Sequence, residues 1–135
     1  MRATIAGLAA LTCAASLVAC GTSSREKNAR RPAQLVADSV AQLERDLTAK
    51  DYEDVCVQVF SSAARTQAGG ADCPRFVARG AAGLRDPHIE LGKIDVHGGA
   101  ATAAVVTRAA GQAAAPEKIR LVWENGRFRI AALAG

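Results

Sequence analysis

The residues of this chain whose chemistry is most distinctive are four cysteines and two histidines. His88 and His97 have no patterned carboxylate beside them, so a metal site, which needs further ligands, is not expected. The sequence places neither histidine in a Ser/His/Asp constellation for nucleophilic catalysis. The glycine pairs at 69–70 and 98–99 are interpreted as turns, and neither belongs to a phosphate-binding loop. These residues thus predict no catalytic group, no metal and no cofactor.

The N-terminal segment has the composition of an export signal. Arg2 precedes an uncharged run over 3–16, rich in alanine and leucine. This run is too short to cross a bilayer, because a membrane-spanning helix needs about 20 residues. The next four residues, Leu-Val-Ala-Cys at 17–20, resemble a bacterial lipobox, which implies cleavage between Ala19 and Cys20 and a diacylglyceryl group on the Cys20 thiol. A plain secretory signal with an incidental cysteine and a retained membrane anchor are the alternatives.

Two cysteines remain for the folded domain. Cys13 leaves with the signal and Cys20 is the expected lipidation site, so Cys56 and Cys73 stay. In an oxidising compartment these two remaining cysteines are interpreted as one disulfide. The loop of about seventeen residues would then contribute about 3 kcal/mol in the chain-entropy model. A two-cysteine metal site lacks further ligands, and a redox pair lacks the usual Cys-x-x-Cys spacing.

The net charge of +4 is concentrated before the folded domain. The run 21–32 has no apolar periodicity and is predicted to be a flexible linker. Its charged residues are Arg25, Glu26, Lys27, Arg30 and Arg31. Residues 33–135 contain 12 basic and 12 acidic residues, so the domain is formally neutral and nucleic-acid binding is not expected. A basic stretch beside a lipid anchor suits an anionic membrane surface, although it also serves as a soluble spacer.

The first half of the domain has helical periodicity. An amphipathic helix is predicted over 33–50, with apolar positions at Val36, Val40, Leu43 and Leu47. Asp51 is the expected N-cap of a short second helix that ends at Phe60, and 61–70 is expected to be a turn or loop. Asp72 is the expected cap of a third helix, with Pro74 in its first turn and Cys73, Phe76, Val77, Gly80 and Leu84 along one face.

In the second half of the domain, apolar and polar residues alternate as they do in β-strands. Within 88–96 the apolar residues occupy odd positions before 92–93 and even positions after it, and this switch predicts a bulge. A second strand is expected over 100–108. The last hairpin turns at Asn125-Gly126, the preferred pair for a type I′ turn. This turn places Trp123 opposite Phe128 on the apolar face, and Glu124 opposite Arg127 as an ion pair.

This order of elements, with Leu-Val-Trp-Glu-Asn-Gly-Arg-Phe-Arg-Ile at 121–130, resembles a nuclear transport factor two-like domain. It also resembles small exported actinobacterial lipoproteins of that fold, which share Asp-Tyr near the first cysteine and a Gly-Gly stretch before the second. The sequence departs from them in having Phe128 where tryptophan is commoner, with Trp123 before the turn. The resemblance implies an α+β fold with three N-terminal helices on a curved, cone-shaped, four-stranded antiparallel sheet. The expected organisation is a signal peptide at 1–19, a lipidated tether at 20–32 and this domain at 33–135.

The same superfamily includes ketosteroid isomerases and polyketide cyclases, which place an acid, a tyrosine or a histidine inside the cone. The corresponding candidates are Tyr52, His88, Asp95 and His97. Asp95 faces away from the core if its neighbours Ile94 and Val96 face inward. We therefore expect a noncatalytic, membrane-anchored extracytoplasmic module that binds a small apolar ligand or a protein partner. An enzyme of the isomerase or cyclase kind is the alternative.

Replacing the lipobox cysteine tests the anchor. Cys20→Ala removes the thiol that would carry the lipid, so we expect the protein to be released or to stay unprocessed. Membrane fractionation and intact-mass measurement read this out. Unchanged membrane partitioning together with unchanged mass would contradict the lipobox assignment.

Overall fold

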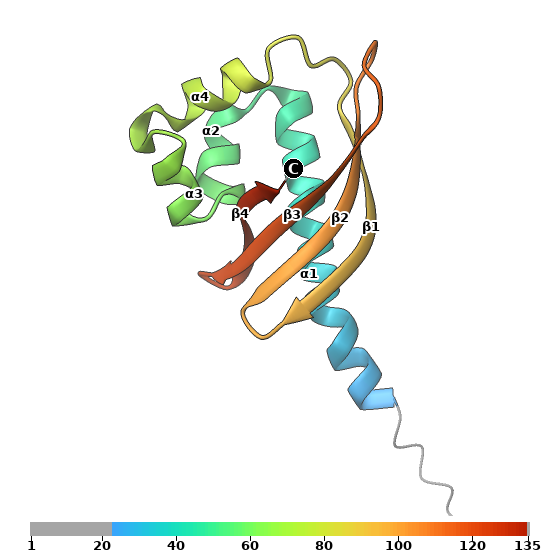
Figure 1. Cartoon of the computed structure of the whole chain (residues 1–135). Coiled ribbons are helices and arrows are strands. Elements are labelled where there is room, and N and C mark those ends of the chain that lie inside the picture. The colour runs from blue at the N-terminus through green and yellow to red at the C-terminus, as the bar shows by residue number, and fades with distance from the viewer. Residues whose placement is uncertain (1–22, 135) are drawn as a thin grey trace, which may run out of the picture.

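A four-stranded antiparallel sheet, with its strands in sequence order, forms one layer of the domain (Figure 1). In the computed structural model, which describes residues 23–134, the strands are β1 His88–His97, β2 Ala100–Arg108, β3 Ala115–Glu124 and β4 Arg127–Ala134. Each strand pairs with the next through a hairpin. The predicted α+β class and the four antiparallel strands are confirmed.

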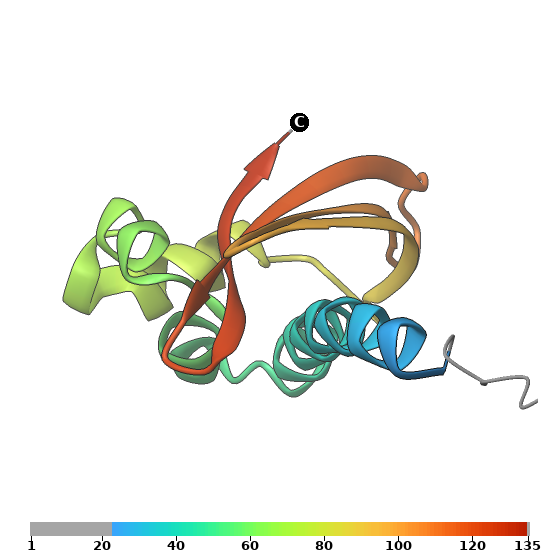
Figure 2. The same ribbon diagram turned by 90° about the horizontal axis from the view of Figure 1, so that it is seen from below.

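Helix α1, Ser23–Ala49, packs along the inner face of this sheet (Figure 2). The inward side chains of β2 include Ala101 and Ala103, both of which are buried. The curved sheet brings its edge strands β1 and β4, rather than β2, nearest to the helix. The core between the two layers consists of Val36, Val40, Leu43, Val55, Val59, Ala101, Ala103, Val105, Ile119, Leu121, Phe128 and Ile130.

The sheet curves over α1, as Figure 2 shows, and its register shifts at two places. In β1 the shift falls between Leu91 and Ile94, which confirms the predicted bulge. An added Cβ at Gly92 would lie 3.2 Å from the Ala104 carbonyl oxygen, so a larger residue would push the two strands apart. In β3 the shift falls between Arg120 and Leu121. Bulges of this kind increase local twist and let a sheet bend around a helix.

Helix α1 begins ten residues before the predicted boundary at Ala33. Residues 23–32, predicted as part of a flexible linker, are therefore helical in the structure and include Pro32. Most residue types of this segment tolerate a helix, and extending an existing helix avoids the cost of nucleation. Pro32 nevertheless removes one intrahelical hydrogen bond.

The short helices number more than predicted. Helix α2, Tyr52–Asp54, continues into a π-helical turn, η1, Val55–Val59, and α4 spans Cys73–Gly80. Between them, the segment predicted as a loop contains helix α3, Ser62–Gln67, and a 3-10 turn at 70–72. The sequence signal for α3 is Ser61, whose side chain accepts a hydrogen bond from the Ala64 N–H at 3.1 Å.

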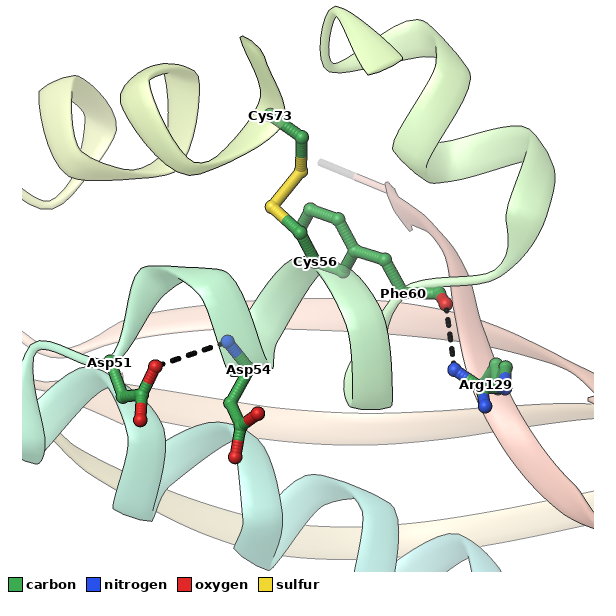
Figure 3. Close-up of a disulfide and its surroundings, with 6 residues drawn as sticks. All are labelled: Asp51, Asp54, Cys56, Phe60, Cys73 and Arg129. Atoms are coloured by element: carbon green, nitrogen blue, oxygen red, sulfur yellow. Dashed lines mark hydrogen bonds between the residues drawn. A yellow bond between two sulfur atoms is a disulfide. The ribbon is translucent and has the colours of Figure 1, made fainter. Parts of the chain in front are cut away.

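A disulfide between Cys56 and Cys73 joins η1 to the start of α4 (Figure 3). The pairing predicted from the cysteine count is confirmed. Both cysteines are buried and form a second apolar cluster with Ala68, against which Phe60 and Val77 pack. The predicted cap is also present, because the Asp51 side chain accepts a hydrogen bond from the Asp54 N–H at 3.1 Å. Phe76, predicted on the inward face of α4, is instead 53% exposed.

The helical segment is fastened to the free edge of β4. The Ser61 N–H donates to the Ile130 carbonyl at 2.9 Å, and Phe60 forms a parallel bridge with the same residue. Arg129 of β4 reaches back to the end of η1, donating from Nη1 to the Val57 carbonyl at 2.6 Å and the Phe60 carbonyl at 3.4 Å (Figure 3). This edge of the sheet is thereby covered by the chain itself.

The closing hairpin has the predicted turn and apolar pair. Asn125 and Gly126 have φ of 51° and 81°, as a type I′ turn requires. The rings of Trp123 and Phe128 meet edge to face at 5.1 Å.

The predicted ion pair of this hairpin is wrong. The Glu124 carboxylate instead accepts hydrogen bonds from the N–H and hydroxyl of Ser62, at 3.0 and 3.1 Å. Arg127 donates to Gln58 at 3.1 Å. The helices packed against β4 supply partners that a hairpin considered alone does not have.

Removing the disulfide should destabilise the domain. Cys56→Ala combined with Cys73→Ala frees a loop of 17 residues in the unfolded state, so we expect the free energy of unfolding to fall by about 3 kcal/mol. Urea denaturation with and without reductant measures this. Reductant should lower the midpoint for the wild type and leave the double variant unchanged; a wild-type midpoint insensitive to full reduction would contradict the expectation.

Candidate functional site

A cavity of about 280 Å³ lies between the C-terminal half of α1 and the sheet, where the β2–β3 loop and the start of β1 meet. Its apolar walls come from the helix, the strands and the segment before β1: Leu43, Leu47, Leu84, Pro87, Ile89, Ala109, Ala113, Ala115 and Ile119. Leu43 and Ile119 belong to the buried core, so the cavity continues inward from the surface to the core. Concave, mostly apolar spaces of this kind are typical of small-molecule sites.

Polar side chains are few along this cavity: His88, Thr107, Arg108, Gln112 and Glu117. Glu117 on β3 is half-buried and shares the inward side with Ile119, two residues further along the strand. Thr107 donates from its hydroxyl to the Ala115 carbonyl at 3.3 Å, which ties the ends of β2 and β3 together. The Arg108 guanidinium lies 3.3 Å from the Glu90 Oε2, and Glu90 does not line the cavity. Glu117 is therefore the carboxylate that the polar end of an apolar ligand could meet.

His88 takes part in the contact that joins α1 to β1 beside this cavity. Its Nδ1 lies 3.1 Å from the Glu44 Oε2. The same oxygen accepts the Ile89 N–H at 2.5 Å. The His88 side chain is 63% exposed, so it stands at the rim rather than inside. Glu44 thus fixes the position of the strand that forms one wall.

The structure separates the four residues suggested by the resemblance. Of these, only His88 lines the cavity. Tyr52 is half-buried on α2, and His97 is exposed at the end of β1. Asp95 lies 3.1 Å from the Lys93 Nζ, while its neighbours Ile94 and Val96 pack against the core. Asp95 therefore faces away from the core, as predicted.

Further observations concern the N-terminal residues, metal ligands and membrane-spanning helices. Ala19 and Cys20, the expected cleavage and lipidation residues, lie outside the described residues, as does the signal peptide. Within 23–134, no group of three or more His, Cys, Asp or Glu side chains is placed to hold a metal ion. No helix of the described part is long and apolar enough to cross a membrane.

Glu117 was missed by sequence reasoning, although a signal was present. It precedes Ile119 by two residues, and alternation along a strand puts both on the same face. The alternation is plainest from Lys118 onward, whereas β3 already begins at Ala115. Extending the alternation back to the start of β3 brings the Glu117 carboxylate onto the inner face of the sheet.

Asp46 is a buried carboxylate outside this cavity. Its Oδ1 accepts a hydrogen bond from the Gln42 side chain at 2.7 Å, while Oδ2 is buried without a partner. Burial raises the pKa of the Asp46 carboxyl, and the nearby carboxylates of Asp54 and Asp51 add to this; the bond from Gln42 opposes it. The group lies on the side of α1 that faces the short helices.

The comparisons with known proteins bear on the fold. No family model matches the sequence, and no curated protein matches it. A solved structure from Campylobacter jejuni, described as an NTF2-like (nuclear transport factor two-like) transpeptidase, is similar. It has a TM-score of 0.50 at 14% identity, covering 71% of this chain and 97% of that chain. At this identity the likeness shows an NTF2-like fold and nothing further.

Asp46 should make stability depend on pH. Because its pKa is raised in the folded state, its contribution to stability is full below its ordinary pKa and is lost as pH rises through the raised value. Asp46→Asn removes this titration, so the free energy of unfolding, measured by urea denaturation, should fall less between pH 4 and pH 7 than in the wild type.

Asp38→Asn is the matched control on the same helix. Asp38 is exposed and accepts a hydrogen bond from Gln34 at 3.0 Å. This variant should keep the wild-type pH dependence. If both variants lost the same amount of pH dependence in their free energy of unfolding, the role assigned to Asp46 would be contradicted.

Proposed function

We propose that this protein is a lipoprotein, anchored through Cys20 on the extracytoplasmic face of the cell membrane, whose NTF2-like domain binds a small, largely apolar molecule. The observation that carries the binding proposal is the cavity of about 280 Å³ bounded by α1, β1 and the β2–β3 loop. The lipobox-like run at 17–20 carries the anchoring proposal. Noncatalytic binding is the proposed activity, with no cofactor and no nucleic-acid partner.

The cavity favours a compact ligand. Its volume of about 280 Å³ is just below the usual range of ligand sites, which begins at about 300 Å³. Leu43, Leu47 and Ile119 offer apolar contact, which is favourable in proportion to the area removed from water. Glu117 can then select ligands by their polar end. An alcohol or amine on the ligand would be attracted by its carboxylate.

Binding is preferred over catalysis on the chemistry of the described residues. A general base works best when a water-poor site tunes its pKa. Burial raises the pKa of the Asp46 carboxyl, but Asp46 does not line the cavity. An isomerase or cyclase is therefore the weaker proposal. The name of the Campylobacter jejuni protein is not carried over, because 14% identity supports the fold alone. In addition, Cys56 and Cys73 are held in a disulfide and offer no thiolate.

A substitution that fills the cavity tests the binding proposal. Ala109 lines the cavity, so Ala109→Phe should occupy the space that a ligand needs. Native mass spectrometry of protein purified gently from its own membrane should show a bound small molecule in the wild type and none in this variant. The neighbouring Ala110 is exposed and does not line the cavity, so Ala110→Phe is the matched control and should retain the ligand.

Each other result has a distinct meaning. An empty domain in all three proteins would contradict small-molecule binding. A ligand retained by Ala109→Phe would place the site elsewhere. A bound protein chain in place of a small molecule would instead favour an interaction module.

A further inference from the structure

Trp123 is the single tryptophan of the chain and is 45% exposed. Its ring meets that of Phe128 in an edge-to-face contact, with the ring centres 5.1 Å apart. The rest of the indole borders a surface groove of about 600 Å³ between α1 and the sheet. An exposed aromatic ring in such a groove leaves apolar area in contact with water, which is typical of surfaces that meet a partner.

This groove lies at the end of the molecule opposite the cavity. Pro32 and Leu35 of α1 form one side, and the turns at Gly98 and Gly126 form the other. Figure 1 shows these two hairpin turns at the end of the sheet beyond which the N-terminal part of α1 extends. Helix α4 lies toward the other end of the molecule. Trp123 is therefore on the side from which the chain continues toward its N-terminus.

The segment that leads to the groove is mostly basic in sequence. Arg31 lines the groove and is exposed. Three further basic residues and one acidic residue belong to the first part of α1: Arg25, Glu26, Lys27 and Arg30. Tryptophan prefers the headgroup level of a bilayer because one side of its ring is apolar and its N–H can remain hydrated. Basic residues are attracted to anionic headgroups.

We propose that the groove around Trp123 docks on the anionic phospholipid surface of the membrane, with the indole in the headgroup layer and Arg31 beside phosphate groups. This inference rests on the proposed lipid anchor at Cys20. Because α1 begins only three residues after Cys20, the groove is held at a high effective concentration near the bilayer. The docked domain would present its cavity away from the membrane.

The single tryptophan makes a direct test available. The full lipidated protein is reconstituted into vesicles of phosphatidylcholine and phosphatidylglycerol that contain lipids brominated near the headgroup end of the acyl chains. Bromine quenches indole fluorescence only at short range, so we expect strong quenching and a blue-shifted emission of Trp123. In Arg31→Gln the ratio of docked to undocked protein should fall about fivefold, the loss expected for about 1 kcal/mol per basic residue.

A relocated tryptophan is the matched control. Phe76 on α4 is 53% exposed and belongs to the opposite end of the molecule. Trp123→Phe combined with Phe76→Trp should stay on the vesicles, with emission typical of water and little quenching. Should this variant fail to fold by circular dichroism, Val57→Trp in the Trp123→Phe background replaces it, since Val57 is exposed on η1.

The remaining outcomes separate the two proposals. Protein that stays on vesicles while Trp123 is quenched no more than the relocated tryptophan overturns docking and leaves the anchor intact. Protein that does not stay on the vesicles overturns the anchor, and docking with it. Trp123 that is shielded from aqueous acrylamide equally in detergent and in vesicles, without bromine quenching, would mean that protein rather than lipid covers the indole, and would overturn docking on lipid.

Discussion

The packing of α1 inside the curve of the sheet, nearest to the edge strands β1 and β4, is the contact on which the rest of this structure depends. Val36 and Val40 of the helix share one buried core with Ala101 and Ala103 of β2. An alanine-rich strand contributes little apolar area of its own, so the larger residues of β3 and β4 complete the core, above all Ile119, Leu121 and Ile130. A larger residue at the fully buried Ala103 would strain this core, since a packed core tolerates little added volume.

The position of α1 also decides where the two open spaces lie. Its C-terminal half forms a wall of the cavity through Leu43 and Leu47, and Glu44 holds the start of β1 there. Its N-terminal half forms a side of the groove through Pro32 and Leu35. One helix thus separates a candidate ligand site from a candidate membrane surface. In the proposed arrangement, lipid anchoring at one end leaves the other end free to exchange its ligand.

The short helices depend on covalent and polar links more than on a core of their own. Helices of three to eight residues are unstable alone. The disulfide ties η1 to α4, and Arg129 ties η1 to β4. The buried Asp46 beside these helices opposes folding when it is charged, because its Oδ2 has no partner. The disulfide thus joins two short elements whose shared apolar cluster consists of only Cys56, Ala68 and Cys73 with Phe60 and Val77 packed against it.

Features that depend on neighbours along the chain were predictable. The type I′ turn at Asn125-Gly126, the bulge at 92–93 and the cap by Asp51 were each read from a few adjacent residues, and all are confirmed. The disulfide followed from the number of cysteines and the expected compartment. The helix over 62–67 was missed because a glycine pair suggested a loop, whereas Ser61 and Gly69 merely bound a short helix.

The sequence by itself determined which side chains alternate, where the chain turns and which cysteines pair, because these properties follow from local geometry and counting. Only the tertiary structure decided that Glu117 and His88 line one cavity, that Glu124 binds Ser62, and that Trp123 stays exposed. Each of these depends on the distance between elements far apart in sequence. That distance is set by the packing of α1 on the sheet, which no local pattern specifies.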